Sequence, residues 1–72
     1  MSDIKVAING ILGKMGQSVL NATLNADGII PISGCDSEKF IKSDHINTSS
    51  GKVNLYSDLA STLDNVDVIV DF

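Results

Sequence analysis

Three glycines near the start of the chain are spaced to receive an anion. Gly10, Gly13 and Gly16 stand between an apolar run typical of a strand and a segment with helical spacing. A strand that opens through glycines into a helix directs free main-chain N–H groups at one point, and the helix dipole favours negative charge there. We therefore expect this loop to bind the diphosphate of a dinucleotide. Gly10 would allow the tight turn, Gly13 the close approach of the ligand, and Gly16 the packing of the helix near the first strand.

The spacing of these glycines, G-x-x-G-x-x-G, differs from the usual dinucleotide fingerprint G-x-G-x-x-G, because Leu12 stands where the shorter motif has a glycine. Taken alone, such glycines also fit an ordinary strand–turn–helix connection that uses them for main-chain freedom. The strand before and the helix after are the context that the binding motif requires. We therefore favour the binding interpretation.

Asp36 stands twenty residues after Gly16, at the end of a second apolar run. At this separation an acidic residue accepts hydrogen bonds from the adenosine ribose of a dinucleotide, although a solvated turn residue is the simpler alternative. A carboxylate suits the free 2′-hydroxyl of NAD and repels the 2′-phosphate of NADP. The chain has no arginine, but Ser37 and Lys39 could bind a phosphate. We expect NADH to be accepted, with NADPH left open.

These residues must be positioned by strands and helices that the apolar pattern predicts. Four strands are expected, over residues 4–9, 29–35, 53–56 and 66–72. A helix is expected over residues 14–26, with Met15, Val19 and Ala22 on one apolar stripe and Leu20 and Leu24 flanking it. Pro31 lacks a donor for the strand ladder, so we expect the second strand at a sheet edge, or the proline near that strand's beginning.

The second half of the chain predicts a polar connection and a short helix. Residues 37–52 are expected to form a loop, with a helical turn over 38–42 as an option. Ser57 is the expected N-cap of a helix over residues 58–63. The residues of this helix expected to face the sheet are Leu59, Ala60 and Leu63. Strands that alternate with helices predict an α/β fold with a parallel sheet, Rossmann-like βαβ units that form the N-terminal half of a dinucleotide-binding domain.

Composition narrows the classes of function. A net charge of −4 without arginine disfavours a nucleic-acid surface. No apolar run approaches the roughly 20 residues of a membrane span, and no signal peptide is apparent, so we expect a cytoplasmic protein. Cys35 is expected to be a packing residue, His45 a solvated loop residue, and no cluster has the spacing of metal ligands. Because 72 residues are short for a domain and end on a strong strand signal, we expect a partial NAD(P)-binding domain from a longer protein, with a complete small domain as the alternative.

The glycine loop with its neighbours, Gly10-x-x-Gly13-Lys14-Met15-Gly16, resembles the N-terminus of bacterial dihydrodipicolinate reductases (4-hydroxy-tetrahydrodipicolinate reductases). That family's loop reads G-x-x-G-[RK]-M-G. An acidic residue at the position of Asp36 and the final run DVIVDF over residues 67–72 also match its pattern. The resemblance spans the whole chain.

The resemblance implies an NAD(P)H-dependent reductase that transfers hydride to a dihydrodipicolinate-type substrate in lysine and diaminopimelate biosynthesis. Ser37 stands where the family often has an arginine, which puts a strong NADP preference in doubt. The cofactor-binding residues that the resemblance and the spacing imply are Gly10, Ile11, Leu12, Gly13, Lys14 and Met15 at the diphosphate, Asp36 and Ser37 at the ribose, and Phe72 toward the nicotinamide.

The family's substrate domain, with its His-rich and Lys-containing signature, has no counterpart in these residues. We therefore assign no catalytic residue and expect the 72 residues alone to be inactive. The resemblance further implies a homotetramer formed mainly through that domain, which would also bind the small-molecule substrate. Two alternatives stay open: the cofactor domain of another Rossmann reductase, related to aspartate or homoserine dehydrogenase, and a non-enzymatic module that senses nucleotides or CoA.

Overall fold

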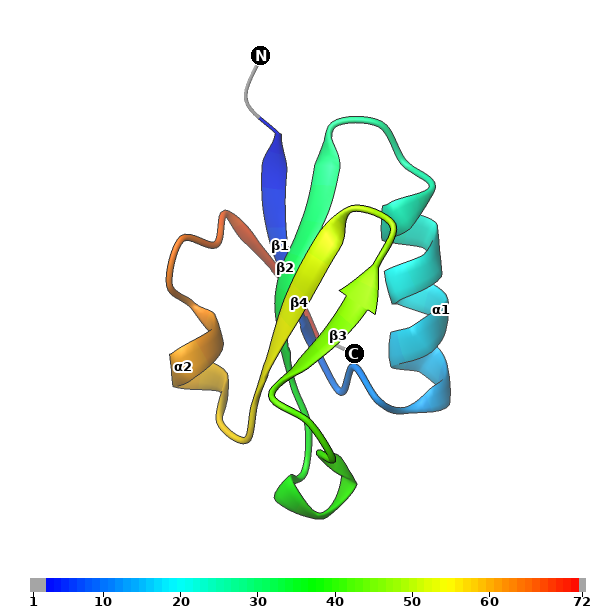
Figure 1. The fold of residues 1–72 in the computed structure, drawn as a ribbon. Coiled ribbons are helices and arrows are strands. Elements are labelled where there is room, and N and C mark those ends of the chain that lie inside the picture. The colour runs from blue at the N-terminus through cyan, green and yellow to red at the C-terminus, as the bar shows by residue number, and fades with distance from the viewer. Residues whose placement is uncertain (1–2, 72) are drawn as a thin grey trace.

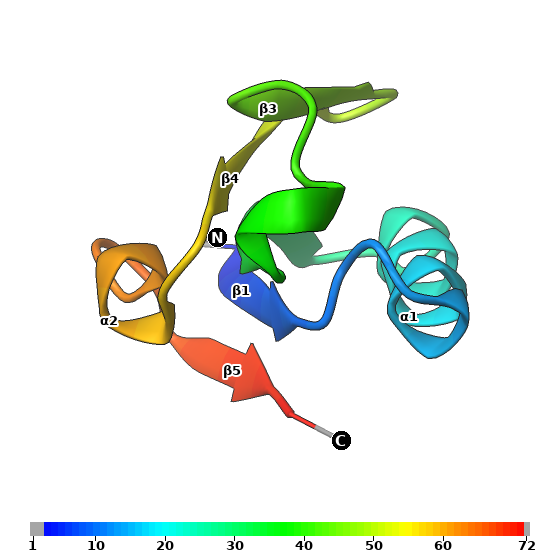
Figure 2. The same ribbon diagram turned by 90° about the horizontal axis from the view of Figure 1, so that it is seen from below.

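A computed structural model describes residues 3–71, which form a single sheet with a helix on each face (Figure 1). Figure 2 shows the sheet end on, with α1 and α2 on opposite sides of it. The elements in chain order are β1 (Ile4–Asn9), α1 (Lys14–Leu24), β2 (Ile29–Cys35), the 3₁₀ turn η1 (Glu38–Phe40), β3 (His45–Thr48), β4 (Gly51–Tyr56), α2 (Leu59–Thr62) and β5 (Val68–Val70).

The sheet has the strand order β3-β4-β2-β1-β5. The pairs β4–β2, β2–β1 and β1–β5 are parallel, and β3 alone pairs antiparallel, with β4. Parallel strands joined by helices that cover both faces define a Rossmann-like α/β domain. The predicted fold class is therefore confirmed, with one antiparallel strand added at the edge.

The strand β3 corrects the prediction of a loop over residues 37–52. Ser49 and Ser50 form a two-residue connection, after which Gly51 opens β4 with φ of +119°. Glycine adopts such a positive φ without steric cost, so the chain reverses and β3 pairs with β4. His45 was predicted to be a solvated loop residue. It instead lies half-buried in a strand.

The buried face of α1 differs from the predicted stripe. Gly16, Leu20 and Thr23 are buried, whereas Met15 is 61% exposed and Ala22 is also exposed. The close approach of Gly16 to the preceding loop sets the rotation of the helix. Thr23 tolerates burial because its hydroxyl donates to the carbonyl of Val19 at 2.8 Å.

The helix α2 is shorter than predicted and is capped by a different residue. Asp58, not Ser57, is the N-cap, since its carboxylate accepts the main-chain N–H of Ser61 at 2.9 Å. Thr62 is the buried residue of this helix. The three residues predicted to face the sheet are instead exposed: Leu59, Ala60 and Leu63.

Pro31 lies within β2, which is an interior strand rather than an edge strand. Its place near the beginning of the strand was the other predicted option, and that one is correct. Pairing between β2 and β4 starts only at Ser33, so the missing N–H of Pro31 leaves no gap in that ladder. On the other side, the register with β1 shifts by one residue between Val6 and Ala7.

The core lies between the sheet and α1. Its buried residues are Val6, Ile8, Ile11, Leu20, Val53 and Leu55. The strand β5 is an edge strand of three residues, shorter than predicted, and its Val68 is 47% exposed. Phe72, one of the predicted cofactor contacts, lies outside the described residues. Within residues 3–71, no helix is long and apolar enough to cross a membrane.

Candidate functional site

The carboxyl ends of the parallel strands bring the predicted site residues to one edge of the sheet. The glycine loop follows β1, Asp36 follows β2, and residues 57 and 58 follow β4. These segments lie together at the lower end of the sheet in Figure 1. Ligands of open α/β sheets bind outside this edge.

The main-chain geometry of the loop depends on Gly10. Its φ of +76° is a left-handed conformation that favours glycine. The N–H groups of Gly10 and Ile11 both donate to the carbonyl of Cys35, at 2.8 and 3.2 Å, and the N–H of Gly13 donates to Gly10 at 3.1 Å. These bonds fasten the loop to β2 and close its turn.

The open donors therefore lie at the start of α1 rather than in the glycine loop itself. N–H groups in the first turn of a helix have no acceptor within the helix, which applies here to Lys14, Met15 and Gly16. The N-cap, Gly13, makes no side-chain hydrogen bond to them. Lys14 and Met15 are both exposed. The first turn is thus an open, positively polarised end of a helix that can receive an anion.

The protein itself requires a glycine at position 16 but not at position 13. A Cβ at Gly16 would lie 2.0 Å from the carbonyl oxygen of Gly10 and 2.7 Å from the Cα of Ile11, so only glycine lets α1 approach the loop this closely. A Cβ at Gly13 would lie 3.4 Å from the same Gly10 oxygen, an ordinary contact. The protein itself therefore tolerates a side chain at Gly13, and the space in front of it is free for a ligand.

The side chain of Ile11 is fully buried in the core and packs on Gly34. No part of Ile11, a predicted cofactor contact, is therefore exposed at this edge of the sheet, and its N–H already donates to the carbonyl of Cys35. The carbonyl of Ile11 accepts a hydrogen bond from the side-chain amide of Gln17 at 2.8 Å, which ties the loop to α1. Sequence reasoning missed both contacts. The isolated glycine inside β2 was a usable signal, because it marks a close approach, whereas nothing in the sequence marks Gln17.

The carboxylate of Asp36 joins the end of β2 to the glycine loop. One oxygen accepts the main-chain N–H of Leu12 at 2.8 Å, and the other accepts the N–H of Ser37 at 2.7 Å. Two carboxylate oxygens offer about four acceptor positions, so positions remain for external donors. The structure thus brings Asp36, a predicted ribose-binding residue, into contact with the glycine loop. Ser37 is exposed beside them.

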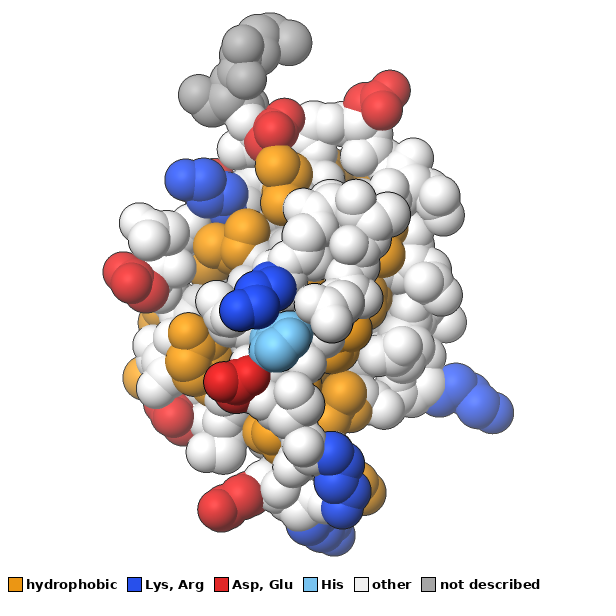
Figure 3. Space-filling model, in the orientation of Figure 1, with side chains coloured by type: hydrophobic (Ala, Val, Ile, Leu, Met, Phe, Trp, Pro, Cys, Tyr) orange, Lys and Arg blue, Asp and Glu red, His pale blue; other side chains and the backbone are white. Residues whose placement is uncertain are grey.

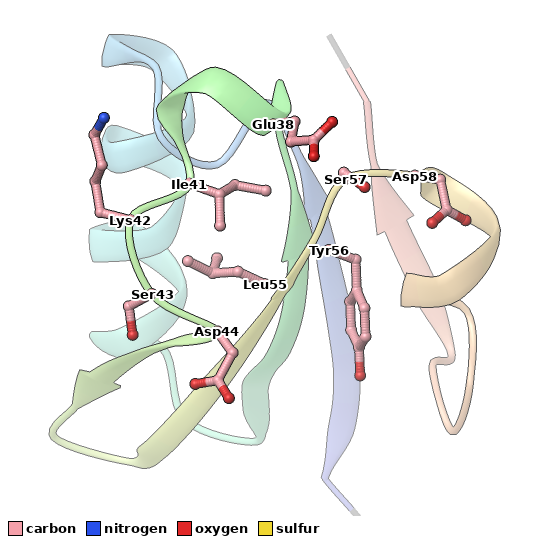
Figure 4. Close-up of a pocket in the computed structure, with 9 residues that line it drawn as sticks. All are labelled: Glu38, Ile41, Lys42, Ser43, Asp44, Leu55, Tyr56, Ser57 and Asp58. Carbon is pink, nitrogen blue, oxygen red and sulfur yellow. The ribbon is translucent and has the colours of Figure 1, made fainter.

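A groove of about 490 Å³ lies next to this edge, between the segment after η1 and β4 (Figure 4). The apolar side chains of Ile41 and Leu55 lie one above the other in its middle. Polar side chains of Glu38, Ser43 and Asp44 flank them. The groove thus combines an apolar floor with a polar rim, which suits a flat heteroaromatic ring.

A chain of hydrogen bonds crosses three strands at the same edge. The thiol of Cys35 donates to the side-chain oxygen of Asn9 at 3.0 Å, and the amide of Asn9 donates to Asp71 at 2.8 Å. Burial, the largest cause, raises the pKa of the Cys35 thiol above its ordinary value, and nearby carboxylates such as that of Asp36 add to the rise. Cys35 is therefore a buried, neutral donor, consistent with the packing role predicted for it.

Other titratable groups lie away from the glycine loop. His45 contacts Asp44 at 2.7 Å, and this hydrogen bond lowers the pKa of the exposed Asp44 carboxyl. His45 begins β3, which is separated from β1 by two strands, and Asp44 directly precedes it. No group of His, Cys, Asp and Glu in residues 3–71 is arranged to bind a metal. On the face shown in Figure 3, lysines and acidic side chains are interspersed and form no single basic patch.

The Nζ atom of Lys39 lies over the ring of the adjacent Phe40, 5.2 Å from its centroid. This contact occupies the ammonium group with a neighbouring aromatic ring, at the turn that follows Asp36. A phosphate on a ribose bound beside Asp36 would have to draw Lys39 away from Phe40 before it could bind the ammonium group.

Comparison with known proteins adds a consistent result. Residues 4–72 match the family described as "Dihydrodipicolinate reductase, N-terminus". The chain is 34% identical, over an alignment of 74 residues, to proteins named 4-hydroxy-tetrahydrodipicolinate reductase from three strains of Dehalococcoides mccartyi, 195, BAV1 and CBDB1. Each alignment covers 100% of this chain and 28% of the relative, so the chain spans little more than a quarter of those proteins.

Proposed function

The chain belongs to the dihydrodipicolinate reductase family, and we propose that it binds the adenosine diphosphate half of NADH or NADPH. The whole protein would then be a reductase of lysine and diaminopimelate biosynthesis, acting on a dihydrodipicolinate-type substrate. When bound, the nicotinamide supplies the hydride. The substrate and the catalytic residues would lie in the remainder of the protein, through which a homotetramer would also form.

The observation that carries this proposal is the open first turn of α1 beside the Asp36 carboxylate. The first-turn N–H groups offer donors for the oxygens of a diphosphate. Asp36 has acceptor positions left for the ribose hydroxyls. The groove with Ile41 and Leu55 offers an apolar surface for the adenine ring. Three neighbouring features thus match the three chemical parts of an adenosine diphosphate.

The groups on this chain bind and orient the cofactor. Gly13 leaves room for the diphosphate, because nothing in the protein requires the space that its missing Cβ would take. Gly16 and Gln17 hold the loop against α1, which keeps the first-turn donors in place. Family membership favours this reductase over the two alternatives, a relative of aspartate or homoserine dehydrogenase and a module that senses nucleotides or CoA.

Cofactor preference follows from charge. A 2′-phosphate would lie against the Asp36 carboxylate and be repelled by it. Lys39 is the nearby cation in sequence that could offset this repulsion, but it contacts Phe40 instead. We expect the full-length protein to use NADH at least as well as NADPH.

The experiment compares kcat/KM for NADH and NADPH in the full-length wild type, in Lys39→Ala and in Lys52→Ala. Lys52 is an exposed lysine at the opposite end of β4, so its variant controls for loss of charge alone. NADPH that does bind would have to draw Lys39 away from Phe40, so Lys39→Ala should lower kcat/KM for NADPH and leave that for NADH unchanged. A marked NADPH preference that survives Lys39→Ala would contradict the argument, and failure to oxidise either cofactor would contradict the proposed function.

A further inference from the structure

The Asp36 carboxylate does more than present an acceptor to solvent. We propose that Asp36 is a positioning residue for the phosphate-binding loop, so that one carboxylate supports both the ribose and the diphosphate parts of the cofactor site. This inference rests on the proposed function, since it concerns how that same site keeps its shape.

The evidence is the distribution of hydrogen bonds in the loop over residues 10–13. Its other main-chain N–H groups donate to main-chain carbonyls, those of Gly10 and Ile11 to Cys35 and that of Gly13 to Gly10. Leu12 alone among the four donates to a side chain, the carboxylate of Asp36, at 2.8 Å. The last stretch of the loop before the helix therefore depends on this carboxylate for its anchor to β2.

The position of Leu12 makes this anchor consequential. Leu12 directly precedes Gly13, the N-cap of α1, which provides no side-chain cap for the helix. A bond between a charged acceptor and a main-chain donor is about twice as strong as a neutral one, and here it is part-buried. The N–H of Ser37 holds the second oxygen at 2.7 Å and so fixes the plane of the carboxylate. The direction of the first-turn donors consequently depends on the charge state and shape of one side chain.

Comparing the binding of two nucleotides distinguishes this positioning role from ribose binding. ADP carries the 2′- and 3′-hydroxyls that Asp36 is proposed to accept, and 2′,3′-dideoxy-ADP carries the same diphosphate without them. A residue that acts on the ribose alone affects only ADP. A residue that also positions the loop affects both nucleotides.

The test measures dissociation constants of both nucleotides for the full-length protein by calorimetry. The variants are Asp36→Asn, which keeps the shape but only one acceptor oxygen, and Asp27→Asn, which removes an equal charge from an exposed site. Asp36→Asn should weaken 2′,3′-dideoxy-ADP about tenfold, the loss expected for one charge-assisted hydrogen bond, and ADP by more. Asp27→Asn should change neither. Hydrogen exchange of the Leu12 amide should be faster in Asp36→Asn, because the bond that protects it is lost.

Unaltered binding of the dideoxy nucleotide in Asp36→Asn, together with weakened ADP, would overturn the positioning role and leave the proposed function standing. A wild type that binds neither nucleotide would overturn the proposed function and this inference with it. If the Asn variant does not fold, Asp36→Glu replaces it in the test. This variant keeps the charge but displaces the carboxylate from Leu12 by one methylene group. It should weaken the dideoxy nucleotide about threefold, the lower end of one hydrogen bond, and wild-type affinity would again overturn the role.

Discussion

The contact between α1 and the loop before it requires that Gly16 carry no side chain. A methyl group in Gly16→Ala would lie 2.0 Å from the Gly10 carbonyl oxygen and 2.7 Å from the Cα of Ile11. Both are main-chain atoms fixed by hydrogen bonds to β2, so no flexible side chain can yield. Overpacking costs about 1–3 kcal/mol of the free energy of unfolding, and the rigid neighbours place this substitution near 3 kcal/mol.

Gly13→Ala is the matched control, three residues away in the same loop. Its methyl group would lie 3.4 Å from the same Gly10 oxygen, and its φ of −78° and ψ of 173° are accessible to alanine. Reduced freedom of the unfolded chain stabilises such a variant by about 0.4–1 kcal/mol. The poorer helix cap costs about 0.5–1 kcal/mol. The two effects nearly cancel, so Gly13→Ala should keep the stability and lose cofactor affinity, because its methyl group enters the space proposed for the diphosphate.

The assay is thermal unfolding of the full-length protein, followed by fluorescence, with titration of NADH on the folded variants. At about 2–4 °C per kcal/mol, the scaling for chains of 150–250 residues, Gly16→Ala should melt roughly 6–12 °C lower. Gly13→Ala should melt within about 2 °C of the wild type on the same scaling. Equal melting temperatures for the two variants would refute the packing argument. Unchanged NADH affinity in a folded Gly13→Ala would refute the position given to the diphosphate.

Three further changes test other parts of the structure. Ser33→Ala removes the buried bond from its hydroxyl to the Thr62 carbonyl, 2.9 Å long, and should cost about 1–2 kcal/mol in urea unfolding. Asp58→Ala removes the cap that accepts the Ser61 N–H and should cost about 1 kcal/mol, whereas Asp58→Asn should retain most of the stability. Because burial raises the pKa of the Cys35 thiol, its alkylation at pH 8 should be slower in the folded than in the urea-unfolded protein. The folded thiol holds its proton more tightly, so its rate should level off at a higher pH.

The parts of the fold that sequence could predict are those with strong local signals. The ranges of β1 and β2 agree with the predicted ones, because a nearly continuous apolar run ends at a glycine or at a polar residue in both cases. Asp36 and the glycine loop were predicted as parts of one site, and they lie together because the carboxyl ends of neighbouring parallel strands meet at one edge. Gly16 was predicted to permit close packing, and its contacts with the loop fit that role.

The parts that sequence could not predict depend on contacts between distant residues. Residues 45–48 contain a single apolar side chain, Ile46, and they form a strand because β4 offers an edge to pair with. The buried faces of α1 and α2 were predicted wrongly because tertiary contacts decide them. For α1 the contact is that of Gly16 with the loop, and for α2 it is the hydrogen bond from Ser33 to the Thr62 carbonyl. Hydrogen bonding lets both Thr23 and Thr62 be buried where an apolar residue was expected.

The two helices begin in opposite ways, and the difference bears on what the site binds. Asp58 caps α2 with its own carboxylate, which accepts the main-chain N–H of Ser61 and places a negative charge at the first turn. The first turn of α1 has no acidic residue and no side-chain cap, and it starts with Lys14, a cation at the end of the helix where the dipole disfavours positive charge. This arrangement costs stability in the free protein, and a bound diphosphate would reverse the cost by supplying the missing negative charge. A chain with a net charge of −4 can thus bind an anion. The main-chain donors contact the anion directly, whereas salt screens the repulsion from carboxylates that lie more than about 8–10 Å away.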